Sequence, residues 1–183
     1  MLETKTRAAG PAALPTWRFW VPLGLQVLMV LAVPLPKLPA YAAGTAVVLR
    51  TVPVDPVDLM RGRYVALGYE IATDAVMKKL PGWKEGMSGP VYFTLAPGQP
   101  AWQAVAIGFE RPGSVPAGDV VLAGKLNGAS VDFELGEYYL AESQGERLNN
   151  ALHDHRTGNL ADIKVDGHGT AVLTGFTVGT TRF

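Results

Sequence analysis

The residue types best suited to metal chemistry lie near the C-terminus. The histidines of the chain are His153, His155 and His168, with Asp154 between the first two and Asp166 just before the third. Two histidines and a third ligand would suit zinc. However, His153 and His155 follow a predicted helix, where residues two apart do not face one another and a basic side chain is favourable for the helix dipole alone. The sequence therefore predicts no metal site and no cofactor.

A second group that could carry chemistry is a run of carboxylates, Glu134, Glu137, Glu142 and Glu146. Two carboxylates flanking a sugar could act as acid and base in an envelope hydrolase. The alternative is a solvated strand edge followed by a helix start, where negative charge is favourable. The pattern favours the alternative, so no catalytic residue is assigned.

Nucleophile motifs are lacking in the sequence. Ser88 lies in a predicted Gly-Met-Ser-Gly loop with no His or Lys at a motif-like spacing. Ser143 begins a Ser-x-x-Glu capping box, which predicts a helix of about ten residues. The chain has no Gly-x-Ser-x-Gly string, phosphate loop or dinucleotide fingerprint. These features favour a binding role over an enzymatic one.

The most patterned stretch is residues 61–71, which contains the form Gly-x-Tyr-x-x-Leu-x-Tyr. Its residues alternate as in a half-buried strand. One face carries the side chains that we expect in the core: Val65, Leu67, Tyr69 and Ile71. Tyr64 faces the other way over the small Ala66 and Gly68. Either the protein covers Tyr64 by ordinary packing, or this shallow surface takes a ligand or partner.

A turn framed by prolines precedes this strand. Residues 45–52 are β-branched and predict a strand, which Pro53 and Pro56 must end. Asp55 is placed to cap a single helical turn that Arg61-Gly62 closes.

Four charges gather around this turn: Arg50, Asp55, Asp58 and Arg61. They could form an ion-pair and capping cluster that fixes the crossing of two strands. They could instead form a recognition patch in which an arginine reaches an acidic group.

The stretch resembles the signature of the GDYXXLXY family, bacterial proteins of unknown function. Residues 49–61, Leu-Arg-Thr-Val-Pro-Val-Asp-Pro-Val-Asp-Leu-Met-Arg, are similar to the family's lead-in, and residues 89–92 and 136–146 resemble further landmarks. The resemblance covers about residues 44 to 175. The family usually has Asp where Arg63 stands, so a role that needs this carboxylate is in doubt here.

The resemblance implies a set of motif residues for a possible binding site: Arg50, Asp55, Asp58, Arg61, Gly62, Arg63, Tyr64, Leu67 and Tyr69. It also implies a multi-span membrane protein as a partner. We therefore expect a membrane-anchored binding or assembly domain, and the alternative is the envelope hydrolase.

The N-terminal region predicts a membrane anchor. After a tail at 1–16, we expect an anchor at 17–38, in which residues 19–36 are almost wholly apolar and long enough for a bilayer core. More basic residues precede this apolar core than follow it, with Lys5, Arg7 and Arg18 before it and Lys37 after it. The positive-inside rule then places the N-terminus in the cytoplasm and the main domain outside. The alternative is a signal peptide cleaved after the Ala-x-Ala box at 40–42.

Composition and patterning predict one β-rich domain at 44–183. The formal net charge is +0, so nothing indicates a nucleic-acid partner, and the chain has no Cys. Short alternating segments separated by Gly and Pro turns predict a β-barrel or sandwich-like fold with one or two short helices. We expect hairpin turns at 95–101, 127–128 and 167–169, and a short helix at 73–84.

Overall fold

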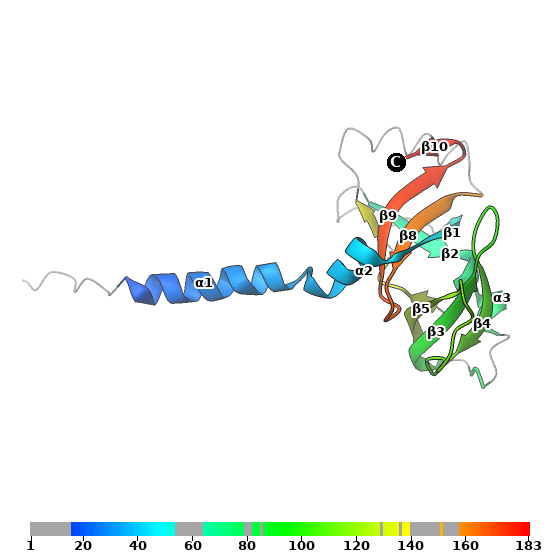
Figure 1. Ribbon diagram of the computed structural model, residues 1–183, viewed down its shortest axis with the longest axis horizontal. Helices are drawn as coiled ribbons and strands as arrows, with labels where there is room; N and C mark the ends of the chain where they lie inside the picture. The colour runs from blue at the N-terminus through cyan, green and yellow to red at the C-terminus, as the bar shows by residue number, and fades with distance from the viewer. Residues whose placement is uncertain are drawn as a thin grey trace, which may run out of the picture. The chain divides into compact units, whose positions relative to one another are not determined.

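A computed structural model of the protein describes residues 16–53, 64–78, 82–84, 86–128, 130–135, 137–139, 151 and 158–183. The chain divides into two compact units, Met1–Pro36 and Lys37–Phe183. The first unit contains α1 (Trp17–Ala32), and the second contains α2 (Leu38–Ala43) and all of the described strands (Figure 1).

The N-terminal apolar stretch is helical but interrupted. α1 has no buried residue, and the helical stretch Trp17–Ala43 is long and apolar enough to cross a membrane. A membrane span and a signal sequence both have these properties. The predicted span at 17–38 is divided after Ala32 by turns that include a 3-10 turn (Leu35–Lys37). Pro34 and Pro36 explain the interruption, because proline cannot donate a helical hydrogen bond.

The second unit is mainly β and consists of two antiparallel sheets, so it is sandwich-like and not a closed barrel. The six-stranded sheet has the order β10-β9-β8-β1-β2-β7, from β1 (Thr45–Pro53), β2 (Tyr64–Tyr69), β7 (Glu137–Tyr139), β8 (Leu160–Val165), β9 (Ala171–Val178) and β10 (Thr181–Arg182). The four-stranded sheet has the order β4-β3-β5-β6, from β3 (Ser88–Ala96), β4 (Gln103–Gly108), β5 (Val120–Asn127) and β6 (Ser130–Asp132).

The signature strand β2 pairs with the end of β1. β1 pairs with β8 along Thr45–Arg50 and with β2 along Thr51–Pro53. Thr51 marks the change of partner, and both its backbone N–H (2.9 Å) and its hydroxyl (3.1 Å) donate to the carbonyl of Asn159. Arg50 is therefore the last residue of β1 on the β8 ladder.

The core lies between the two sheets, as the alternating patterns predict. Leu67, Tyr69 and Ile71 are buried, which confirms the core face of the signature. An aromatic cluster joins the sheets, since the Phe133 ring packs edge-on against Tyr69 at 5.8 Å and Phe93 at 5.2 Å between centroids. Burying each such side chain stabilises the fold by about 1.5–3 kcal/mol.

The predicted turns are confirmed, whereas two element boundaries differ from the prediction. Hairpins join β3 to β4, β5 to β6 and β8 to β9. The helix expected at 73–84 is only α3 (Asp74–Met77), preceded by a 3-10 turn (Glu70–Ala72) that ends the signature strand at Tyr69. The helix expected after Ser143 lies outside the described residues, apart from Ala151.

β6 stops at Asp132 for a local reason. The Asp132 carboxylate accepts the backbone N–H of Glu134 at 2.7 Å, and Glu134 takes a left-handed backbone with φ 56°. The Glu134 N–H therefore donates to the Asp132 side chain instead of to the backbone of a neighbouring strand.

Among the described residues, backbone hydrogen bonds connect the two sheets or their loops at two places, which we call seams. At the Trp102 seam, the Trp102 N–H donates to the Val48 carbonyl of β1 at 2.8 Å. At the Gly169 seam, the Ala123 N–H of β5 donates to the Gly169 carbonyl in the β8–β9 turn at 2.9 Å. Each seam borders one of the hollows described below.

Candidate functional site

The buried half of the signature builds the scaffold. The Tyr69 hydroxyl donates to the Leu135 carbonyl at 2.8 Å, and burial raises the pKa of the Tyr69 phenol well above its ordinary value. Leu67 and Tyr69 are 8% and 5% exposed, so most of each side chain is packed in the core. These two residues anchor the signature strand in the core, and their proposed binding role stays a prediction.

Five of the predicted site residues lie outside the described part of the chain: Asp55, Asp58, Arg61, Gly62 and Arg63. Tyr64 is placed at the start of β2 opposite Tyr139, and its side chain is not described. The proposed cap, the ion-pair cluster and the binding role of Tyr64 therefore stay predictions.

Arg50 stands at a cleft, which we call the Trp102 cleft. Its volume is about 360 Å³, and its walls include Arg50, Glu70, Ile71, Gln99, Trp102 and Gln103. Arg50 Nε lies 3.3 Å from Glu70 Oε2, and the two side chains are 43% and 57% exposed. The cleft thus presents a charged pair to solvent beside an aromatic ring.

The local chain positions each wall of the Trp102 cleft. Arg50 comes from the end of its β8 ladder, and Glu70 begins the 3-10 turn that follows the signature strand. The Thr73 hydroxyl fixes this turn by donating to the Glu70 carbonyl at 3.0 Å. Trp102 lies in the β3–β4 hairpin, which contains the cis Gln99-Pro100 bond, and its side chain is half-buried. Its backbone N–H donates to the Val48 carbonyl of β1, which holds the hairpin in place.

Sequence reasoning found Arg50 but missed Glu70 and Trp102 as its neighbours. Neither residue belongs to the motif residues that the sequence indicated for a binding site. The available signal was the string Gln-Pro-Ala-Trp, in which a turn proline precedes a large aromatic residue. The combination of Arg, Glu, Trp and Gln side chains can recognise a polar segment by hydrogen bonds and ring contact.

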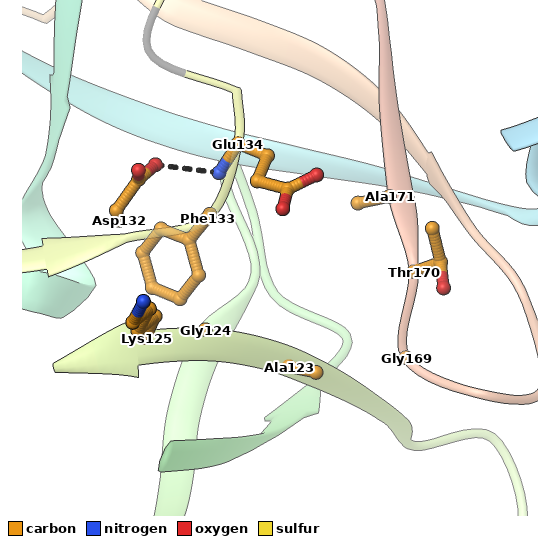
Figure 2. A pocket seen from close by; sticks show the side chains of 9 residues that line it. All are labelled: Ala123, Gly124, Lys125, Asp132, Phe133, Glu134, Gly169, Thr170 and Ala171. Carbon is orange, nitrogen blue, oxygen red and sulfur yellow. Dashed lines mark hydrogen bonds between the residues drawn. The ribbon is translucent and has the colours of Figure 1, made fainter. Parts of the chain in front are cut away.

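A second hollow lies at the Gly169 seam, and we call it the Glu134 hollow (Figure 2). Its volume is about 270 Å³, and it is lined by Ala123, Gly124, Lys125, Asp132, Phe133, Glu134, Gly169, Thr170 and Ala171. The Glu134 side chain reaches toward β9 across the hollow, while the Phe133 ring lies over Gly124 (Figure 2). Lys37 Nζ bonds Glu134 twice, to the carbonyl at 3.3 Å and to Oε2 at 3.4 Å.

Glycine is required at two points of the Glu134 hollow. Gly169 has φ +91°, and a Cβ there would meet the Ala123 N and Cβ and the Val121 carbonyl at 3.1 Å. A Cβ at Gly124 would meet Phe133 and Val131 at 2.8–2.9 Å. Gly169 therefore permits close approach to the backbone of β5, and Gly124 leaves room for the Phe133 and Val131 side chains.

The Gly68 side of the signature strand borders a smaller depression of about 190 Å³. Val52, Gly68, Thr73, Ser130 and Val131 are among its lining residues. Leu67, Tyr69 and Phe133 of the core also line this depression, so it is not confined to the small-residue face of the strand. The position of the Tyr64 side chain relative to it is not described.

The candidate catalytic groups do not converge within the described residues. Ser88 opens β3 opposite Asn127, so it lies on a strand and not in the predicted loop. His168 is exposed in the β8–β9 turn, where its backbone N–H donates to Asp166 at 2.8 Å. His153 and His155 lie outside the described part, as do the side chains of Glu137, Glu142 and Glu146. Among the described residues, no group of three or more His, Cys, Asp or Glu could hold a metal ion.

Comparison with known proteins identifies the family from most of the chain. The family model described as GDYXXLXY protein matches residues 26–176. No curated protein and no solved structure matches the sequence. The matched segment contains the signature strand, the Trp102 cleft, the four-stranded sheet and the six-stranded sheet up to Phe176 in β9. The chain belongs to the GDYXXLXY family.

Proposed function

We propose that the protein is a membrane-anchored binding or assembly domain whose Trp102 cleft receives an exposed segment of a membrane protein partner. The observation that carries this proposal is the position of Arg50. This residue of the signature lead-in lines a cleft with Trp102 and Glu70, whereas Leu67 and Tyr69 are buried in the core.

The composition of the Trp102 cleft suits a polypeptide segment. Tryptophan and arginine are the residues that most often dominate protein interfaces. The Arg50–Glu70 pair presents both signs of charge, and the exposed amides of Gln99 and Gln103 add donors and acceptors at the rim. A neutral, polar loop with a side chain that stacks on Trp102 would match these features.

The anchor is the other half of the proposal. We place the tail 1–16 in the cytoplasm, residues 17–38 in the membrane lipid and the domain 44–183 outside, on the bacterial cytoplasmic membrane. The apolar stretch and the basic residues before it support this orientation. Intact-mass analysis of membrane-extracted protein tests it, because a mature chain beginning at Ala43 would contradict the anchor.

Site-specific photo-crosslinking tests the cleft. A photoreactive residue in place of Gln103, on the rim of the cleft, should capture a membrane protein in intact cells. Adding the Trp102→Ala substitution to this variant should reduce the yield of crosslinked partner about tenfold, which corresponds to about 1.4 kcal/mol of binding free energy. The matched control is the same photoreactive residue at Val115, which is exposed but does not line the cleft. Equal capture of the same partner from both positions, or no effect of Trp102→Ala, would overturn the assignment of the cleft.

A further inference from the structure

α2 exposes apolar side chains that have no cover among the described residues. Its sequence is Leu-Pro-Ala-Tyr-Ala-Ala, and Ala40 alone is buried. Leu38 is 50% exposed and Tyr41 is 64% exposed. No residue of this helix carries a charge. Its outward surface resembles the apolar side of an interfacial helix, with a tyrosine of the kind that concentrates at membrane–water boundaries.

α2 is nevertheless fixed to the second unit. Ala40 is fully buried, and α2 contacts β8 and β9. A Cβ at Gly44 would lie 2.3 Å from the Ala40 carbonyl oxygen and 3.1 Å from the Lys164 Cβ, so the helix end is packed as closely as glycine permits. Lys164 Nζ donates to the Tyr41 carbonyl at 3.0 Å and lies 5.7 Å from the centre of the Tyr41 ring.

Chain length places α2 close to the bilayer once α1 is embedded. The 16 residues of α1 extend about 24 Å, which is less than the roughly 30 Å of a hydrocarbon core. The apolar residues that follow Ala32 must therefore complete the crossing. Five residues separate α1 from α2, and they can extend at most about 20 Å.

We propose that α2 lies in the headgroup layer of the membrane that α1 spans, and that it holds the β8–β9 side of the second unit against that surface. This inference rests on the anchor in the proposed function. Lys37 and Lys164 are already bonded to Glu134 and Tyr41, and α2 has no basic face of its own. The apolar side chains therefore drive the contact, and anionic lipid is not required.

The placement also assigns the Glu134 hollow to the membrane side of the domain. Lys37, the residue before α2, contacts Glu134 on the rim of that hollow. Tyr41 is tied to β8 through Lys164, and β8 pairs with β9, whose first residue Ala171 lines the hollow. The Trp102 cleft is lined by other segments and does not share these residues.

Single-cysteine labelling tests the inference cleanly because the chain has no native Cys. The full chain is reconstituted in phosphatidylcholine vesicles, with a nitroxide attached in turn to Leu38→Cys, Tyr41→Cys, Leu28→Cys and Val115→Cys. Leu28 lies in α1, and Val115 is an exposed residue of the second unit. Depth is measured from accessibility to oxygen and to a water-soluble nickel chelate.

The expected result is a graded series. The label at 28 should report the hydrocarbon core, the labels at 38 and 41 the headgroup layer, and the label at 115 water. Adding anionic phosphatidylglycerol should leave the depths at 38 and 41 unchanged. The Tyr41→Cys variant loses the Tyr41 ring that lies near Lys164, which could loosen α2. The Leu38→Cys variant keeps Tyr41, so its label still reports the depth of the intact helix.

Two outcomes would overturn the inference in distinguishable ways. If the label at 28 is embedded while those at 38 and 41 are as accessible to nickel as the label at 115, α2 is not interfacial and the anchor stands. If the label at 28 is also in water, the anchor and the interfacial helix both fail. A depth at 41 that requires phosphatidylglycerol would overturn the apolar mechanism.

Discussion

The two seams between the sheets are alike in their backbone bonds and differ in what surrounds them. At the Gly169 seam, glycines and alanines let β5 and the β8–β9 turn approach closely, and a Cβ at Gly169 would meet backbone atoms at 3.1 Å. At the Trp102 seam, a large ring and a charged pair surround an open cleft. The Gly169 seam requires a residue without a side chain at Gly169, whereas the Trp102 seam exposes the side chains of Arg50 and Glu70 to solvent. The Gly169 seam is thus a close backbone junction, and the Trp102 seam borders the cleft for which we propose a binding role.

Gly169→Val should give the largest effect on stability. Its φ of +91° disfavours a β-branched residue, and the added atoms would overlap Ala123 and Val121. We expect the free energy of unfolding to fall by about 2–5 kcal/mol. Urea unfolding of the detergent-solubilised chain, followed by near-ultraviolet circular dichroism, measures it.

Gly167→Val is the matched control for this seam, since a Cβ at Gly167 has no atom within 4 Å. It should change stability by less than about 0.5 kcal/mol. Equal losses in the two variants would show that the turn, and not the contact with β5, determines the effect.

Trp102→Ala should cost less than Gly169→Val, because the Trp102 side chain is only half-buried. We expect a loss of about 1–3 kcal/mol, below the 3–5 kcal/mol typical of a fully buried aromatic residue. The same unfolding experiment measures it, and Trp102→Phe should recover most of the loss. A loss as large as that of Gly169→Val would place Trp102 in the scaffold and end the contrast between the seams.

Tyr69→Phe tests how firmly the core supports the Glu134 hollow. The Tyr69 hydroxyl bonds the Leu135 carbonyl, and Tyr69 packs on Phe133 in the wall of the hollow. Removing the hydroxyl leaves a buried carbonyl without its donor and should cost about 1–2 kcal/mol at neutral pH. Urea midpoints of the two proteins give the difference, and no change would show that water replaces the hydroxyl.

The same pair of proteins should differ in alkaline solution. Burial raises the pKa of Tyr69 above its ordinary value of 10.0, so the folded state favours the neutral phenol. The stability linked to this group is fully present below pH 10.0 and is lost as pH rises through and beyond that value, by up to about 1.4 kcal/mol per pH unit. Unfolding measured from pH 9 to 11 should show a steeper decline for the wild type than for Tyr69→Phe; parallel curves would contradict the burial effect.

The Arg50–Glu70 pair should give the smallest effect. Both side chains are about half exposed, so a double-mutant cycle with Arg50→Ala and Glu70→Ala should give a coupling below about 1 kcal/mol. Raising the salt to 1 M, where the screening length is about 3 Å, should weaken it further. A larger, salt-resistant coupling would indicate that the pair holds the fold and is not available for recognition.

The sequence predicted best what depends on local alternation. Leu67, Tyr69 and Ile71 could be assigned to the core because residues two apart share a face of a strand. Glu134 could not be placed, because its conformation depends on a bond to the Asp132 carboxylate that competes with strand pairing. The proximity of Trp102 to Arg50 could not be predicted, because it depends on how the two sheets pack and not on spacing along the chain.

The junction at Gly44 has a mechanical consequence. The chain passes from α2 into the first residue of β1, and β1 lies inside its sheet between β8 and β2. Its pairing with β8 begins at once, with Thr45 opposite Val165, and continues to Arg50. A pull directed along β1 would load these hydrogen bonds together in shear, whereas a strand peeled from an edge would lose its bonds one pair at a time. The chain therefore enters the domain at a strand that is well placed to resist a pull applied through α2.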